Sequence, residues 1–189
     1  DGLELLGRTA EVVFSVQPSL EEARQFYAKV KNAAVKFGRS SAEIKIMPGV
    51  MPVIGRTEDE ALEKFEELQS LIDINDAIKL LSTVCVYDFT GHPIDGPLPE
   101  VPEVYNSNSR FRLVADTAKK ENLTLRQVAQ RFTGARGHRV IFGTPESIAD
   151  QLQHWFENEA ADGFNVMPPV FPTGLEDFVD QVVPVLQKR

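Results

Sequence analysis

Apolar residues along the chain follow two alternating periods, which predict strands followed by helices. Short runs rich in β-branched and aromatic residues at 11–14, 44–47 and 164–167 are bounded by turn residues and have the composition of buried strands. A further strand is predicted at 140–142. The stretches between these runs carry apolar residues at every third or fourth position, the helical spacing. A helix that feeds a short buried strand is the repeating unit of a parallel sheet, so the pattern favours an α/β fold.

The start of each main helix is marked by a capping signal. Ser/Thr and Glu/Gln three residues apart predict capping boxes at Ser19–Glu22, Thr57–Glu60 and Thr124–Gln127. Thr144 is predicted as an N-cap because Pro145, which lacks an N–H, suits the first helical position. These signals predict helices that begin after residues 19, 57, 124 and 144.

Proline, glycine and aromatic positions give three finer predictions. Pro48–Gly49 predicts a bulge or the end of the second strand, with 50–54 as a possible continuation. Pro184 predicts a kink near the end of a last helix at 174–188. In the helix after Thr144, one apolar stripe is predicted toward the sheet, formed by Ile148, Leu152, Trp155 and Phe156.

Residues 73–139 interrupt the strand–helix alternation. The proline-rich run 93–102 predicts turns and polyproline structure, and further helices are predicted near 109–120 and after Thr124. Long insertions in a regular α/β fold carry binding residues more often than not. We therefore treat 73–139 as an insertion segment within one domain of 1–189.

Composition narrows the range of partners and locations. The chain has 189 residues, a formal charge of −8 and a pI near 5.0, which disfavours nucleic acid and anionic membranes as partners. No apolar run approaches the length of about 18 residues that a membrane span needs. The single Cys85 cannot form an internal disulfide, which favours a reducing, cytoplasmic setting. Three scattered histidines and one cysteine show no metal-ligand spacing, so no metal site is predicted.

Six stretches together carry a resemblance to a known family. They are LELLGRTAEVVF at 3–14, FYAKVKNAAVKFGRS at 26–40, IKIMPGVMPVIGRTEDEALEKFEELQ at 44–69, ENLTLRQVAQRFTGARGHRVIFGTPESIADQL at 121–152, DGFNVMPP at 162–169 and FVDQVVPVLQKR at 178–189. These stretches resemble the bacterial luciferase-like, flavin-dependent monooxygenases. Within that family they are similar to the group that holds nitrilotriacetate monooxygenase component A, dibenzothiophene-sulfone monooxygenase and long-chain alkane monooxygenase.

The resemblance implies a fold and an activity. Members of the group are (β/α)8 TIM barrels of roughly twice this length, so the chain is expected to be the C-terminal portion of such a barrel, its last three βα units. They use reduced FMN (FMNH2), supplied by a partner flavin reductase, and O2 as co-substrate to oxygenate a small organic substrate. A homo-oligomer is also expected. The alternative left open is a non-catalytic partial-barrel module that must pair with another chain, because three or four strands leave open sheet edges.

Five residues are candidates for the site, each with a role that the resemblance implies. Arg136 matches an Arg-bearing mobile loop that closes over flavin and substrate, and a guanidinium can hold an anion bidentately. His138 is a candidate to donate a proton to a flavin hydroperoxide or accept one from substrate. A solvated basic loop, which would also include Arg139, is the equally weighted alternative. Gly2 is the candidate to lie beside the FMN phosphate, and Asn165 and Met167, at the end of the last strand, are the candidates to line the flavin pocket. For Met167, packing at the strand end is the alternative and is given somewhat more weight.

Overall fold

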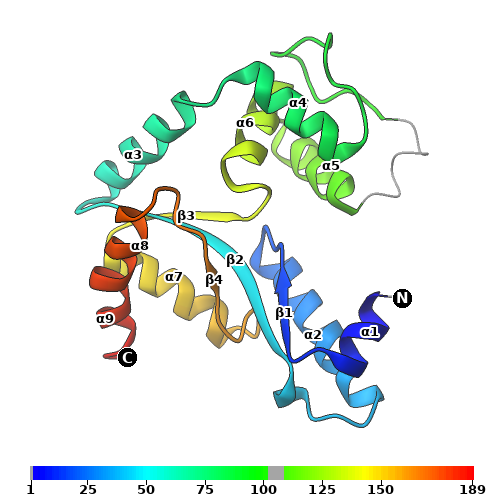
Figure 1. Cartoon of the computed structure of the whole chain (residues 1–189), viewed down its shortest axis with the longest axis vertical. Helices are drawn as coiled ribbons and strands as arrows, with labels where there is room; N and C mark the ends of the chain where they lie inside the picture. Colours follow the sequence, from blue (N-terminus) through cyan, green and yellow to red (C-terminus); the bar gives the residue numbers. More distant parts are fainter. Residues whose placement is uncertain (1, 102–108) are drawn as a thin grey trace. The chain divides into compact units, whose positions relative to one another are not determined.

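The structure is a computed structural model that describes residues 2–101 and 109–189. The chain divides into two compact units (Figure 1). Unit 1 comprises Asp1–Phe65 and His138–Arg189, and unit 2 comprises Glu66–Gly137. The insertion was predicted at 73–139, a boundary that remains a prediction, and the compact unit in this region runs over 66–137.

Unit 1 is built on a parallel sheet whose central strand is β2. All pairings in the sheet are parallel, as the strand–helix alternation predicts, and β1, β3 and β4 each pair with β2 (Figure 1). The first part of β2 pairs with β1, from Val12↔Lys45 to Ser15↔Pro48. The second part pairs with β3, and its middle pairs with β4. The strands are β1 (Val12–Ser15), β2 (Lys45–Ile54), β3 (Arg139–Gly143) and β4 (Asn165–Val166).

The prediction that Pro48–Gly49 ends or bulges the second strand was wrong, because β2 continues through both residues. The reason lies in the edge that the missing proline N–H faces. Ile46 accepts from the N–H of Asp162, and Val50 accepts from the N–H of Met167, so alternate residues of β2 bond toward the 162–167 segment. Pro48 lies between these two positions, and its absent N–H falls on that edge. The pairing with β1 is therefore left intact.

Helices cover one face of the sheet and begin where the capping signals predict. Ser19 accepts from the N–H of Glu22, and Thr144 accepts from the N–H of Ser147. One core cluster joins Ile46 to α2, and another joins Val50 to α7. The helices of unit 1 are α1 (Gly2–Thr9), α2 (Leu20–Lys36), the 3-10 turn η1 (Ser41–Glu43) and α7 (Pro145–Glu157), and α3 (Glu58–Ser70) begins in this unit.

The apolar stripe of α7 is narrower than predicted. Ile148, Leu152 and Trp155 are buried, whereas Phe156 is 59% exposed. At about 100° per residue, Trp155 lies only about 20° around the helix from Ile148 and Phe156 about 80°. Phe156 therefore lies at the edge of the stripe and faces away from the core.

The last helix changes its hydrogen-bonding pattern before Pro184. It consists of α8 (Thr173–Asp177), a π-helical turn η3 (Phe178–Val182) and α9 (Val183–Leu186). The N–H of Val183 bonds to the carbonyl of Phe178, five residues earlier. Pro184 has no N–H to give the carbonyl of Asp180, so the wider turn replaces regular α-helical bonding before the proline. The irregularity predicted from Pro184 is thus a π-helical turn, and it comes earlier than expected.

The Asp162 carboxylate ties α2 and β2 to the turn that leads into β4. It lies 2.8 Å from the Lys31 ammonium, and both side chains are more than four-fifths buried. It also accepts from the backbone N–H of Ile46 at 2.8 Å and from the Tyr27 hydroxyl at 3.1 Å. The Lys31 ammonium donates further to the carbonyls of Ile44 and Ser41. A buried charge pair needs such extra hydrogen bonds to offset the cost of removing it from water.

Alkaline pH should weaken unit 1 through Tyr27. Burial, and then the negative charge of Asp162, raise the pKa of Tyr27 to about 12 from the usual 10.0. The unfolded chain therefore releases this proton first, so its stabilising contribution is complete below pH 10 and is lost between pH 10 and 12. Urea unfolding at several pH values, followed by the fluorescence of the single Trp155, should show a steeper loss for wild type than for Tyr27→Phe. Parallel curves for the two proteins would contradict the assignment.

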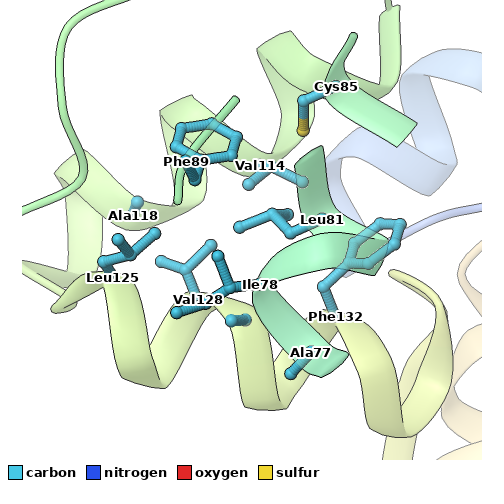
Figure 2. Packing of buried hydrophobic residues seen from close by; sticks show 11 residues of the cluster. Ala77, Ile78, Leu81, Cys85, Phe89, Val114, Ala118, Leu125, Val128 and Phe132 are labelled. Atoms are coloured by element: carbon cyan, nitrogen blue, oxygen red, sulfur yellow. The ribbon is translucent and has the colours of Figure 1, made fainter. Parts of the chain in front are cut away.

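Unit 2 is a small helical unit with a core of its own. Its helices pack around a cluster of buried side chains (Figure 2). The helix α4 was not predicted, although Asp73 caps it by accepting from the N–H groups of Asn75 and Asp76. The helices that lie wholly in this unit are α4 (Ile74–Cys85), α5 (Ser109–Glu121) and α6 (Leu125–Ala135). The core residues are Ala77, Ile78, Leu81, Cys85, Phe89, Val114, Ala118, Leu125, Val128, Ala129 and Phe132.

The proline-rich segment of unit 2 is fixed to the start of α6. The N–H groups of Leu125 and Arg126, which have no partner within the helix, donate to the carbonyls of Gly96 and Ile94. The Arg126 guanidinium also pairs with the Asp95 carboxylate at 2.7 Å. The turn structure predicted for this run is confirmed over its described part, and position 102 lies outside the described residues. These bonds hold a segment that has little regular structure of its own.

Candidate functional site

Side-chain alternation divides the sheet of unit 1 into two faces. Ile46, Val50 and Ile54 of β2 belong to the core clusters under the helices. Successive side chains of a strand point to opposite faces, so the odd-numbered residues of β2 lie on the other face. Register then assigns residues of the neighbouring strands to that same face. We call it the site face and define it by Phe14, Met47, Gly49, His138, Asn165 and Met167.

His138 lies directly before β3, and its ring is fixed by contacts with two other strands. The imidazole stacks on the Phe14 ring of β1, with ring centroids 5.1 Å apart and an interplanar angle of 23°. It also lies against Gly49 of β2, where a Cβ atom would come within 2.4 Å of its Nδ1. Three strands thus place the imidazole on the site face, where it is half-buried.

Asn165 and Met167 come to the same region of the sheet. Asn165 is the register partner of Gly49, so the amide and the His138 imidazole flank one residue of β2. Asn165 is exposed and Met167 is half-buried. The backbone N–H of Met167 donates to the carbonyl of Val50 at 2.9 Å, which fixes the chain where β4 ends. An amide, an imidazole and a thioether therefore share one face of the sheet.

Arg136 has a structural position that the sequence did not predict. It is the C-cap of α6 and has left-handed backbone angles, φ 52° and ψ 34°. Its side chain is exposed, and within the described part of the chain it has no hydrogen bond or ion pair. Arg136 belongs to unit 2 and His138 to unit 1. Its role toward an anion remains a prediction.

Arg139 does not join His138, although the two are neighbours in sequence. Its register partner is Val50, so its side chain lies on the helix-covered face. The guanidinium lies 4.6 Å from the centre of the Trp155 ring and donates to the side-chain oxygen of Gln151 at 3.0 Å. Burial lowers its pKa from the usual value. Strand alternation thus places His138 and Arg139 on opposite faces of the sheet, and Arg139 packs against α7.

Gly2 is the first residue of α1, where no other group lies within 4 Å of the position that its Cβ would take. The helix packs on α2 through Gly7, which lies against the backbone of Ala33. The assignment of Gly2 to the FMN phosphate remains a prediction.

Phe14 and Gly49 are the residues of this region that sequence reasoning missed. Phe14 was predicted only as part of a strand, yet it is 57% exposed and stacks on a candidate catalytic ring. Gly49 did carry a signal, because a glycine within a strand often marks the close approach of another group. Among the described residues no group of three acidic, cysteine or histidine side chains is arranged to hold a metal ion. In the same part of the chain, no helix combines the length and apolarity that a membrane crossing requires.

Comparison with known proteins identifies the family. The family model described as luciferase-like monooxygenase matches residues 1–162, most of the chain. The chain belongs to the luciferase-like monooxygenase family. The resemblance drawn from sequence motifs is therefore confirmed at the level of the family.

Two curated members of this family match the whole chain. Nitrilotriacetate monooxygenase component A of Aminobacter aminovorans is 47% identical over 190 residues, and N-acetyl-S-(2-succino)cysteine monooxygenase of Bacillus subtilis (strain 168) is 45% identical over 192 residues. The match covers 42% of the first protein and 44% of the second. The chain thus spans less than half the length of these luciferase-like relatives.

A solved structure supports the fold. The crystal structure of DmoA from Hyphomicrobium sulfonivorans superimposes on the whole chain with a TM-score of 0.84 at 27% identity, and the match covers 39% of that protein. The α/β fold of this luciferase-like chain, with its parallel sheet, agrees with that relative. Its assignment to the last three βα units of a barrel belongs to the proposal below.

Proposed function

We propose that this chain is the C-terminal portion of a luciferase-like TIM barrel that uses reduced FMN and O2 to oxygenate a small organic substrate. The observation that carries the proposal is the convergence of His138 and Asn165 at Gly49, on the face of a parallel sheet in a monooxygenase family. A parallel sheet that closes into a barrel turns one face inward, and ligands bind near the carboxyl ends of its strands, where Phe14 of β1 and Met167 after β4 lie. His138 reaches the same level of the sheet from the amino end of β3. The site face is the inward face in this proposal.

The residues present fit a flavin ring. His138 and Asn165 supply polar groups at one level of the sheet, and the apolar Met47 lies on the same face. Flat ligands with a polar edge bind to such combinations of apolar area and a few placed hydrogen-bonding groups. Met167 would add apolar contact on the same face. For the phosphate, the backbone N–H groups at the start of α1, beside Gly2, are the candidates.

Reduced FMN supplies the electrons for activating O2, and the chain supplies binding and proton control. The imidazole of His138 would hold or transfer a proton at one of its ring nitrogens. The amide of Asn165 can donate to one acceptor and accept from one donor at the edge of the bound ring. The guanidinium of Arg136, exposed at the end of α6, would hold an anionic group of the substrate or cofactor. Side chains of the insertion would set substrate choice.

The relatives suggest further partners. One relative is named as component A of a nitrilotriacetate monooxygenase, which supports a two-component system with a separate flavin reductase. We further propose a cytoplasmic protein that assembles as a homo-oligomer. No nucleic-acid or membrane partner is proposed, in keeping with the acidic composition.

A second candidate is a non-catalytic partial-barrel module that pairs with another chain. Val12 is 63% exposed on β1, beside the exposed Phe14. Apolar strands left open in this way are usually covered in stable proteins. This candidate predicts a stable complex with a second chain and no affinity for reduced FMN.

Anaerobic titration with reduced FMN, followed by flavin fluorescence or heat, tests the first candidate. We expect saturable one-to-one binding by the enzyme that contains this chain, and severalfold weaker binding by its Arg136→Gly variant, because a charge-assisted hydrogen bond to an anion is lost. Glycine is the informative replacement, since the left-handed angles of Arg136 suit it without strain. The weaker binding would then come from the missing guanidinium and not from a disturbed helix end.

Lys79→Ala is the matched control, because it removes another exposed cation from unit 2 whose only ion pair in the described structure is with the exposed Asp76. It should bind reduced FMN as wild type does. Absence of binding by the wild-type enzyme, together with a stable complex with a second chain on light scattering, would favour the non-catalytic module. Binding by the isolated 189 residues would mean that they hold most of the flavin site.

A further inference from the structure

We propose that Phe14 and Gly49 are positioning residues for His138, together holding its imidazole in one orientation on the site face. The inference rests on the proposed function, since it concerns the residue to which that function gives proton transfer. It adds two residues that sequence reasoning left without a role. Each contacts the ring from a different strand.

Gly49 makes room for the ring. A Cβ at this position would lie 2.4 Å from Nδ1, 2.8 Å from Cε1 and 3.0 Å from Cγ of His138. All three separations are shorter than van der Waals contact, so the imidazole lies directly on the backbone of β2. The backbone of Gly49 is also fixed by its pairing with Asn165. Any larger residue would push the ring out of its place.

Phe14 limits rotation of the ring. The two rings are nearly parallel and 5.1 Å apart, within the range of favourable stacked pairs. Phe14 lies on the site face, outside the core clusters of the described residues, and contacts the His138 ring there. The register partner of Phe14 is Met47, two residues before Gly49. The Phe14 ring of β1 and the Gly49 backbone of β2 therefore contact the imidazole at neighbouring positions of the sheet.

Position matters for this residue because it lies at a joint in the chain. His138 precedes the first residue of β3 and follows Gly137, which has a φ of 85°. The backbone before it thus turns through a glycine with a positive φ, and the contacts of the side chain fix the orientation of the ring. Proton transfer needs the donor within hydrogen-bond reach of its target, and small misplacements cost rate steeply. The contacts with the Phe14 ring and with the Gly49 backbone together hold the imidazole in place.

Histidine NMR tests the geometry directly. The chain has three histidines, and His138→Gln assigns the signal of His138. The ring current of Phe14 should displace the ring protons of His138 upfield in wild type. This displacement should vanish in Phe14→Leu and persist in Phe14→Tyr, while Gly49→Ala should move the signal. Val12→Ala, which shortens another exposed side chain of β1, is the matched control and should leave the signal unchanged.

Kinetics of the full enzyme test the role. Phe14→Leu should lower kcat severalfold with KM for reduced FMN within twofold of wild type, and Phe14→Tyr should restore kcat. Combined with His138→Gln, Phe14→Leu should cause no further loss, because both changes remove the same function. A His138 signal unmoved by Phe14→Leu, or fully multiplicative losses in the double variant, would overturn the proposal. If the wild-type protein shows the upfield displacement but His138→Gln has normal activity, the proton-transfer role is refuted and the positioning of the ring by Phe14 and Gly49 still holds.

Discussion

Replacing Asp162 by alanine is expected to lower the free energy of unfolding of unit 1 by about 3–5 kcal/mol. The change leaves the Lys31 ammonium charged and largely buried without its carboxylate partner. It also leaves the N–H of Ile46 without the acceptor that lies 2.8 Å away. Removing one partner of a buried pair costs more than the pair itself contributes, because the remaining charge has lost its hydration as well.

Urea unfolding followed by Trp155 fluorescence measures this loss, since the only tryptophan of the chain is buried in unit 1. Asp162→Asn should lose less, because an amide oxygen can still accept from Ile46. The control is Arg24→Ala, which breaks an exposed pair with Glu21 on the same helix as Lys31 and should change stability by less than about 0.5 kcal/mol. Equal effects of Asp162→Ala and Arg24→Ala would show that the buried pair contributes no more than a surface one.

The second large effect is expected in unit 2, where Phe89→Ala should cost about 3–5 kcal/mol. Phe89 is fully buried in the helical core and packs with Leu81 and Cys85 in one cluster (Figure 2). Truncation to alanine removes a whole ring from this cluster. The cost includes both the lost burial and the cavity left behind, since packed helices close only partly around such a void.

Cys85 reports on this unit without interference from the rest of the chain, because it is the only cysteine. Its thiol is inaccessible, and burial raises its pKa to about 11, so labelling at neutral pH requires the unit to open. Phe89→Ala should speed labelling by about a hundredfold to a few thousandfold, the equivalent of the lost free energy. Leu71→Ala, which truncates a residue of unit 2 that is 76% exposed, should leave the rate unchanged. Equal labelling rates in all three proteins would mean that Phe89 does not stabilise the core.

Local signals predicted most of unit 1. Ser19, Thr124 and Thr144 cap helices as predicted, because a cap depends on residues only three positions apart. The capping box at Thr124–Gln127 is complete, whereas the Glu22 carboxylate accepts from the Ser19 hydroxyl instead of the Ser19 N–H. Thr57 likewise accepts from the N–H of Glu60, but the Glu60 carboxylate bonds to the N–H of Arg56 and not to that of Thr57. The Glu60 side chain thus reaches Arg56, one residue before the Thr57 N–H that it would bond in a capping box. The helix is therefore predicted correctly and one detail of its cap is not.

The sequence of the helix α4, which was not predicted, does contain helix signals. Asp73 is an N-cap residue, and Ile74, Ile78 and Cys85 fall on one helical face. The helix packs within unit 2, so its apolar face has no place in a strand–helix alternation. A pattern sought only in terms of that alternation therefore passed over it.

The sequence named some residues of the site face but gave neither Phe14 and Gly49 nor the geometry that joins them to His138. His138, Asn165 and Met167 were named from the resemblance, and register places Asn165 beside Gly49. The stack of His138 on Phe14 joins residues more than a hundred positions apart, and no local rule carries that information. Arg139 shows that neighbours in sequence need not be neighbours in the site. Adjacent residues of a strand face opposite sides, so Arg139 lies over Trp155 and away from His138.

The direct bond between the ends of β2 and β3 bears on how this family can diversify. The N–H of Gly55 donates to the carbonyl of Gly143, and the rings of Phe65 and Phe142 stack 5.7 Å apart. The register of the two strands is thus supported by contacts within unit 1. The entropic cost of closing a connection between two strands grows only with the logarithm of its length. Gains and losses of residues within unit 2 can therefore accumulate during evolution while the sheet of unit 1 keeps its pairing.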